Sequence, residues 1–284
     1  MKNKRLIASL AFVACLSAIA GRAAGDVTPP PADKPEVTVE LAQLVDKTKM
    51  KIQAGANTEA ALAEELKEFD ALLAEHKDEK TDAVAEVLFM KASLYVEVIQ
   101  DYDKGEELLK RVKADFPQTQ AAKNISQMLA ALERQKKTMK IQAALVPGVV
   151  FPDFNEKDLA GDPLSIAKFK GKVVLVDFWA TWCGPCVGEL PNVLAAYKKY
   201  HDKGFEIIGI SLDRDKNALK SFIKENGMVW PEYFDGLEWD SKLGQKYGID
   251  SIPMTFLIDQ GGRIVAKGLY GPALDAELAK LLGK

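Results

Sequence analysis

The sequence contains few of the side chains that hold transition metals. Among its 284 residues there are two histidines, His76 and His201, and three cysteines. Zinc sites take three or four ligands, largely from these residue types. Three cysteines in a chain of this length also exclude a disulfide-stapled mini-protein. We therefore expect neither a multi-ligand metal site nor a small disulfide scaffold.

The chain also lacks an excess of positive charge. It has 38 basic and 41 acidic side chains, a formal net charge of -3. Nucleic-acid-binding domains need a clustered basic surface, so no nucleic-acid partner is expected. No phosphate-cradling glycine loop precedes a helix, which argues against a nucleotide cofactor. The sequence therefore predicts an activity that needs no cofactor.

Long apolar runs are absent except near the N-terminus. A basic stretch at residues 2–5 precedes an apolar run at residues 6–20, and small residues follow at 21 and 23–25. This is the layout of a secretory signal peptide, and the run is short for a membrane span. We expect cleavage between residues 20 and 25 and a periplasmic or otherwise extracytoplasmic mature protein. A retained membrane anchor and a lipid on Cys15 are the less favoured alternatives.

Proline and glycine are scarce in one part of the chain and abundant in another. Four prolines lie in residues 26–36, which form a stiff linker. Residues 37–146 contain one proline and two glycines, whereas residues 147–284 contain eight prolines and sixteen glycines. Sparse turn residues favour long helices, and dense ones favour many short elements. We therefore predict a helical domain over 37–146 and a second domain over 147–284.

The first domain has the apolar spacing of amphipathic helices. Helices are predicted over 39–54, 59–76, 82–100, 106–115 and 119–142. Asp103 and Glu106 form a candidate capping box for the fourth helix. Residues 106–124 resemble the junction of two tetratricopeptide-type helix pairs, without a clean period. This domain is interpreted as a degenerate array that spaces or docks a partner and carries no chemistry of its own.

The second domain alternates strands and helices. Near-continuous apolar runs predict buried strands over 172–179 and 205–212, and a hairpin is predicted over 253–258 and 263–268. Helices are predicted over 185–203, 216–226 and 275–282. This order predicts an α/β fold, a mixed sheet with helices on both faces.

The chemistry is expected in Cys183, Gly184, Pro185 and Cys186, at the junction of a buried strand and a helix. Free N–H groups at a helix N-terminus stabilise a thiolate, so the Cys183 sulfur should ionise more readily than a free cysteine. Cys186, one turn further on, should be more buried and close enough to form a disulfide. Cys183 would attack a substrate disulfide and Cys186 would resolve the mixed disulfide.

Three other interpretations of the cysteine pair compete with this one. A structural zinc site would need two more ligands at suitable spacing, and the sequence offers neither a second such pair nor a nearby histidine. An inert disulfide across so short a loop would add little stability. Two unrelated buried thiols would not be expected at a strand-to-helix junction.

The cysteine segment closely resembles a known family. Residues 176–186, Val-Asp-Phe-Trp-Ala-Thr-Trp-Cys-Gly-Pro-Cys, are similar to the active-site segment of thioredoxin-fold proteins. Glu189 and Pro191 are typical of the extracytoplasmic TlpA/ResA-like branch of the redoxin superfamily. The resemblance covers residues 149–284 and includes the Ile252-Pro253 pair. It implies a thioredoxin-like fold and thiol-disulfide oxidoreductase activity.

The resemblance also implies roles for residues around the cysteines. Pro253 should follow a cis peptide bond and, with Ile252, expose backbone groups to an extended substrate. Trp182, Gly184 and Pro185 should form the neighbouring contact surface for that substrate.

Two acidic residues are candidates for the proton chemistry. Asp177 lies in an apolar run, where desolvation raises a carboxyl pKa, and the resemblance implies that it exchanges a proton with Cys186. Many members of the branch have asparagine at this position. An exposed acid at the edge of a strand is the alternative. Glu189 should tune the thiols or guide partner choice, or else simply favour a positive helix end.

These features predict an envelope enzyme that reduces protein disulfides and receives electrons from a membrane thiol carrier. The Gly-Pro dipeptide between the cysteines resembles that of reducing thioredoxins. A thiol peroxidase is the first alternative, but Ala180 stands where the related peroxidases have threonine. The second alternative is a partner-docking protein in which the helical domain is primary.

Overall fold

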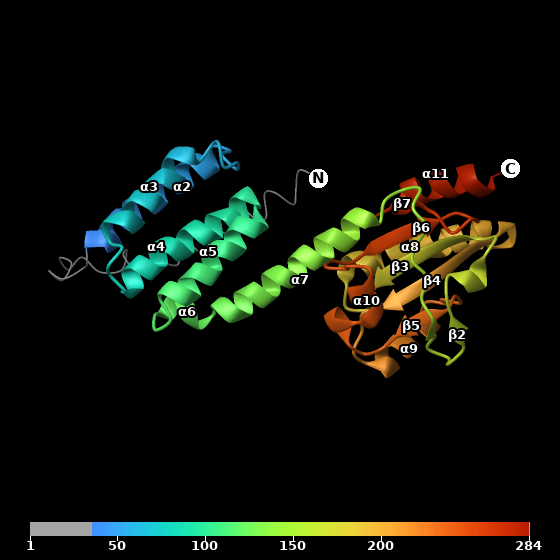
Figure 1. Ribbon diagram of the computed structural model, residues 1–284. Helices are drawn as coiled ribbons and strands as arrows, with labels where there is room; N and C mark the ends of the chain where they lie inside the picture. Colours follow the sequence, from blue (N-terminus) through green and yellow to red (C-terminus); the bar gives the residue numbers. More distant parts are fainter. Residues whose placement is uncertain (1–35, 284) are drawn as a thin grey trace. The chain divides into compact units, whose positions relative to one another are not determined.

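The computed structural model describes residues 36–283 (Figure 1). The expected signal peptide and nearly all of the proline-rich linker lie outside the described residues. The chain divides into two compact units, and the boundary lies between Lys136 and Lys137. None of the helices in residues 36–283 combines the length and the apolar character needed to cross a bilayer.

The first unit is helical. Its elements are α2 (Glu36–Gln53), α3 (Ala63–Glu75), α4 (Asp82–Ser93), the π-helix η1 (Leu94–Ile99), α5 (Tyr102–Asp115), α6 (Gln120–Lys123) and the beginning of α7 (Ile125–Ala144). Helices that follow one another from α2 to α5 pack together. Their apolar faces form a core of their own, in which Leu62, Phe69 and Leu88 are buried.

Two expectations for the first unit need correction. The fourth helix, α5, starts at Tyr102 and not at residue 106, because Asp101 is the N-cap and accepts a hydrogen bond from Lys104 N at 3.0 Å. The predicted capping box is therefore wrong. The expected helix over 119–142 is interrupted at Asn124, which ends the short helix α6 before α7 begins.

The second unit is built on a five-stranded mixed sheet in the order β5-β4-β3-β6-β7. These strands are β3 (Val173–Trp179), β4 (Phe205–Ser211), β5 (Glu232–Phe234), β6 (Met254–Ile258) and β7 (Ile264–Lys267). Strands β3, β4 and β5 are parallel, and β6 is antiparallel to both β3 and β7. The buried apolar runs and the hairpin are confirmed, whereas the three-residue strand β5 has no counterpart among the predicted elements.

The remaining elements of the second unit are short or helical. They are β1 (Glu156–Lys157), β2 (Pro163–Leu164), η2 (Ala167–Phe169), α8 (Gly184–Tyr200), η3 (His201–Lys203), α9 (Lys216–Glu225), η4 (Glu238–Asp240), α10 (Lys242–Lys246) and α11 (Gly271–Leu282). Helices α8 and α11 pack together. Strand β3 alternates between the two faces of the sheet: Asp177 and Trp179 line a cavity with residues of α8 and α11, whereas Phe178 packs edge-on against Tyr247, which follows α10.

The unit boundary lies ten residues before the expected one at 146/147, because the end of α7 packs onto the second unit. The Gln142 side chain donates to the Tyr247 and Gly248 carbonyls at 2.7 and 3.1 Å. Lys267 Nζ donates to the Gln142 carbonyl at 2.9 Å. Gly248 has φ +61° and lies against Ile141, where a side chain would have little room. Residues 137–146 therefore belong structurally to the second unit.

Candidate active site

The two cysteines form a disulfide at the start of α8. Their Cα atoms are 5.2 Å apart. Cys183 is the N-cap of the helix, and its sulfur accepts a hydrogen bond from Cys186 N at 3.2 Å. Gly184 and Pro185 form the exposed first turn, where proline has no N–H to leave unsatisfied. This position favours a negative charge on the Cys183 sulfur when the bridge opens.

The expected difference in burial between the two cysteines is not found in the oxidised form. Cys183 is 5% exposed and Cys186 is 7% exposed. The bridge holds both sulfurs at one depth, so their difference comes from their surroundings. Cys183 caps the N-terminus of α8, whereas Cys186, in the first turn of the helix, lines a cavity.

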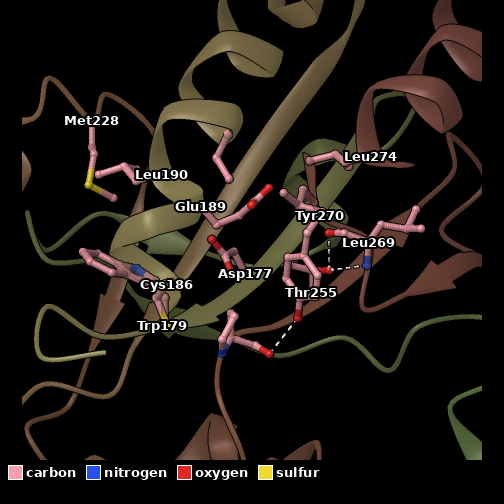
Figure 2. Close-up of a pocket in the computed structure, with 13 residues that line it drawn as sticks. Asp177, Trp179, Cys186, Glu189, Leu190, Met228, Thr255, Leu269, Tyr270 and Leu274 are labelled. Atoms are coloured by element: carbon pink, nitrogen blue, oxygen red, sulfur yellow. Dashed lines mark hydrogen bonds between the residues drawn. The ribbon is translucent and has the colours of Figure 1, made fainter. Parts of the chain in front are cut away.

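This cavity has a volume of about 20 Å³, enough to hold about one water molecule. Figure 2 shows the side chains that project into it from β3, α8, β6 and the segment before α11. The residues used below are Asp177, Cys186, Glu189, Pro253, Thr255 and Tyr270. The structure therefore brings both predicted acids, the second cysteine and the predicted cis-proline to one place.

Among the ionisable groups that line the cavity, Asp177 has the pKa that its surroundings shift most. Burial, with a smaller contribution from the nearby charge of Glu189, raises the pKa of Asp177 to about 7. A carboxyl with this pKa is present in both protonation states near neutral pH. It can therefore accept a proton and later return it, as general acid–base catalysis requires. The alternative of an exposed acid at a strand edge does not fit this position.

Glu189 connects two helices. Its carboxylate accepts hydrogen bonds from Gly271 N, at the start of α11, and from Asn192 Nδ2 at 3.1 Å. The residue before α11, Tyr270, provides no side-chain cap. Glu189 therefore satisfies an N-terminal N–H group of α11, and not one of its own helix, and it lines the cavity together with Asp177 (Figure 2).

The Ile252–Pro253 peptide bond is cis, which confirms that prediction. Tyr270 Oη donates to the Pro253 carbonyl at 2.6 Å and fixes the turn (Figure 2). Within residues 36–283, the N–H and C=O groups of Ile252 have no protein hydrogen-bond partner. Since unpaired backbone groups can pair with an added extended segment, Ile252 is suited to hold a substrate chain.

Trp182 lies at the surface beside another tryptophan. It is 49% exposed, and its ring centre lies 5.9 Å from that of Trp239, which is 40% exposed. We call these two residues the tryptophan pair. Two other aromatic residues nearby in the sequence, Trp230 and Tyr233, are buried, whereas Trp239 adds to the exposed apolar surface beside Trp182.

Asp213 is a buried acid just after β4 that was not among the predicted site residues. It is 3% exposed and accepts hydrogen bonds from Thr181 N at 3.1 Å, Thr181 Oγ1 at 2.6 Å and Ser211 Oγ at 2.8 Å. It thereby fixes the loop just before Trp182 and Cys183. Its position directly after a buried parallel strand was the available signal, because such strands end at one edge of a sheet.

Glu232 was missed by the sequence analysis. It is 3% exposed, and its carboxylate accepts hydrogen bonds from Trp179 Nε1 at 3.0 Å and Trp230 Nε1 at 2.9 Å. Gly209, in the middle of a buried strand, was the available signal, because glycine in such a strand often marks a close approach by another group.

Comparisons with known proteins agree with this geometry. The model of the Redoxin family matches residues 147–281. A thiol-disulfide oxidoreductase ResA of Bacillus thuringiensis subsp. konkukian is 35% identical over 133 residues, which cover 47% of this chain and 75% of that protein. A ResA of Geobacillus thermodenitrificans is 32% identical over 43% of this chain and 69% of that protein. The chain belongs to the ResA-like thiol-disulfide oxidoreductases.

Solved structures of similar proteins cover the same fraction of the chain. The thioredoxin domain of a thiol-disulfide oxidoreductase from Bacteroides vulgatus is 37% identical, with a TM-score of 0.45, over 49% of this chain and 99% of that one. A thiol:disulfide interchange protein from Bacteroides sp. is also 37% identical, with a TM-score of 0.45, over 50% and 93%. The predicted thioredoxin-like fold, preceded by a helical region, and the predicted oxidoreductase class are confirmed.

Proposed function

We propose that this ResA-like protein is an envelope reductase of protein disulfides, in which Cys183 and Cys186 cycle between dithiol and disulfide. The observation that carries the proposal is the bridged pair at the N-terminus of α8, with Cys183 as the capping residue. A pair that closes reversibly across three residues, with one sulfur stabilised as a thiolate, is suited to exchange with another disulfide.

The reaction passes two electrons from the protein to its substrate. The Cys183 thiolate attacks one sulfur of a substrate disulfide, the substrate S–S bond breaks, and a mixed disulfide forms while the first substrate thiolate leaves and takes up a proton. Cys186 then gives its proton to Asp177, directly or through the one water that the cavity can hold. The Cys186 thiolate attacks Cys183 Sγ, which closes the bridge and releases the second substrate sulfur as a thiolate that takes up a proton, while Asp177 later gives up the proton it received.

Substrate recognition is assigned to the surface around Cys183. The free backbone groups of Ile252, next to cis-Pro253, would pair with an extended segment of the substrate. Gly184 and Pro185 leave the approach to the sulfur open. The tryptophan pair offers an apolar contact to side chains beside the substrate disulfide.

Features of the sequence support the proposed direction and location of the reaction. The Gly-Pro dipeptide between the cysteines resembles that of reducing thioredoxins, whose potentials lie at about -270 mV. A membrane thiol carrier would return the oxidised pair to the dithiol. The signal-peptide pattern of residues 1–25 supports an extracytoplasmic location, and cleavage there would remove Cys15 together with any lipid site.

Trapping of partners tests the mechanism. In a Cys186→Ala variant, Cys183 can form the mixed disulfide but no residue can resolve it, so substrate proteins should accumulate in complexes that dithiothreitol releases. A Cys183→Ala variant is the matched control and should trap none. Equal trapping by both variants, or none by either in envelope extracts, would contradict the assigned roles.

A further inference from the structure

Two acidic residues occupy one row across three neighbouring strands. In the register of the sheet, Asp177 of β3 is paired with Gly209 of β4, and Gly209 is paired with Glu232 of β5. Residues paired directly across strands point to the same face of a sheet. Asp177 and Glu232 therefore share the face that carries the active-site cavity, with only a glycine between them.

The carboxyl group of Glu232 fills the space that Gly209 leaves. A Cβ atom added at Gly209 would lie 2.1 Å from Glu232 Oε2 and 2.2 Å from Glu232 Oε1. The carboxyl therefore lies over Gly209, on the side toward Asp177. Any other residue at position 209 would displace it.

Two indole groups hold the Glu232 carboxyl in this position. Trp230 Nε1 donates to Oε1 at 2.9 Å, and Trp179 Nε1 donates to Oε2 at 3.0 Å. Trp179 is also part of the cavity wall that Asp177 and Cys186 share. Within residues 36–283, neither Asp177 nor Glu232 forms an ion pair with a lysine, arginine or histidine. Glu232 is therefore buried and Asp177 half-buried, and no positive charge among these residues compensates the pair.

We propose that Glu232 is a positioning residue for the dithiol chemistry: it binds protons as one pair with Asp177 and so sets the pH range in which Asp177 can accept the Cys186 proton. The inference rests on the proposed function. Two carboxylates that lie close together with little water around them cannot easily ionise together, so they titrate as a unit. One proton held on Glu232 leaves Asp177 ionised and ready to accept the proton from Cys186.

The other groups that face the pair are also acidic or neutral. From α8 and the segment before α11, Glu189, Tyr270 and the Cys186 thiol face Asp177. Asp213, after β4, acts on Glu232 through its charge. Glu189 accepts hydrogen bonds from Gly271 N and Asn192 Nδ2, and Asp213 accepts them from Thr181 N and Thr181 Oγ1. Within residues 36–283, the side-chain donors to the Glu232 carboxyl are the indole N–H groups of Trp179 and Trp230.

The pKa values of both carboxyl groups are raised above their usual range. Burial, as the largest cause, raises the pKa of Glu232 to about 8, the Trp179 hydrogen bond opposes this, and the Asp177 charge adds to it. Burial raises the pKa of Asp177 to about 7. Both therefore change protonation in the range where the resolving step operates.

Carboxyl-carbon NMR titration of the full-length oxidised protein tests the pairing directly. In Glu232→Gln, Asp177 loses its acidic partner, so its titration midpoint should fall by about one pH unit, a typical size for a close pair of acids. The acid limb of the rate of mixed-disulfide resolution should move down by the same amount. Glu206→Gln is the matched control, since Glu206 is also buried on β4 but pairs with Lys172, and it should change neither value.

A second variant keeps the inference testable if Glu232→Gln does not fold. Trp230→Phe leaves the Glu232 charge and removes one donor to its ionised form, so Glu232 should hold its proton more tightly. The Asp177 midpoint should then also fall, by less than in Glu232→Gln. An Asp177 midpoint unchanged from wild type in either folded variant would overturn the pairing. The trapping result with Cys186→Ala would not be affected, so failure of the proposed function is recognised separately.

Discussion

At the scale of single residues, the two active-site sulfurs differ in what surrounds them. Cys183 caps α8, so its thiolate is stabilised by the free N–H groups of the helix. Cys186 opens onto the cavity that contains Asp177. The first cysteine is therefore suited to attack and the second to lose its proton only when the bridge is to be closed.

Asp177→Asn should slow mixed-disulfide resolution and remove its dependence on a group with a pKa of about 7. Loss of a positioned general base typically costs about 10²- to 10⁴-fold. The attack of Cys183 on a model disulfide should change little, because Asp177 does not take part in that step. Single-turnover kinetics with a mixed disulfide preformed on Cys183 separates the two steps. A resolution rate within about twofold of wild type from pH 6 to 8 would show that Asp177 is not the base.

The same residue makes stability depend on pH. Because the pKa of Asp177 is higher in the folded state than in the unfolded chain, the protonated form stabilises the fold below about pH 4, and this stabilisation is lost as the pH rises through about 7. Asp177→Asn should remove this loss and make the oxidised protein more stable at pH 8, by on the order of 2 kcal/mol. Denaturant unfolding at pH 4 and pH 8 measures the effect. The control is Glu225→Gln at the exposed end of α9, which should show the wild-type slope; the same slope in Asp177→Asn would contradict the assignment.

At the scale of elements, the active site is assembled where α8, β3, β6 and α11 meet. Glu189 is the direct connection between the two helices, since it accepts the Gly271 N–H at the start of α11. The cis-proline turn before β6 is fixed by Tyr270, the residue that precedes α11. The position of α11 thus affects both walls of the cavity.

Glu189→Ala should loosen this connection. The variant removes a cap from α11 and leaves the Gly271 N–H without its acceptor, which should lower the free energy of unfolding by about 1–2 kcal/mol. Glu189→Gln keeps an acceptor oxygen and should recover most of that loss. Hydrogen exchange at the first turn of α11 should become faster in the alanine variant only. Equal exchange rates in all three proteins would contradict the capping role.

The sequence predicts some of these elements well and others poorly. The apolar runs that form β3 and β4, and the hairpin β6–β7, are continuous and long enough to be recognised from their residues alone. Strand β5 has three residues and begins with a glutamate, so no pattern marks it. Burial of Glu232 depends on the order of three strands, and burial of Asp213 depends on where β4 ends beside the cysteine loop. Neither follows from local sequence.

At the scale of the whole molecule, the chain consists of a helical unit and a redox unit joined within α7. The family match covers only the second unit. The first unit has its own apolar core, which does not depend on residues of the redox unit. We propose that it docks a partner, as the sequence analysis suggested.

The unit boundary predicts which truncation is tolerated. A protein that begins at residue 137 keeps Ile141 and Gln142, which contact the second unit, whereas one that begins at residue 147 loses them. The shorter form should be less stable by on the order of 2 kcal/mol, from lost packing and hydrogen bonds. Both should still reduce insulin, and activity on the native partner should be lost in both if the helical unit docks it. Equal melting temperatures of the two forms would contradict the structural boundary.

The most direct test of the central claim is the reduction potential of the Cys183–Cys186 pair in the full-length protein, equilibrated against dithiothreitol and followed by tryptophan fluorescence or alkylation. We predict one reversible two-electron couple at about -270 mV. A bridge that does not reopen and close reversibly, or a potential above about -150 mV, would contradict a reductase.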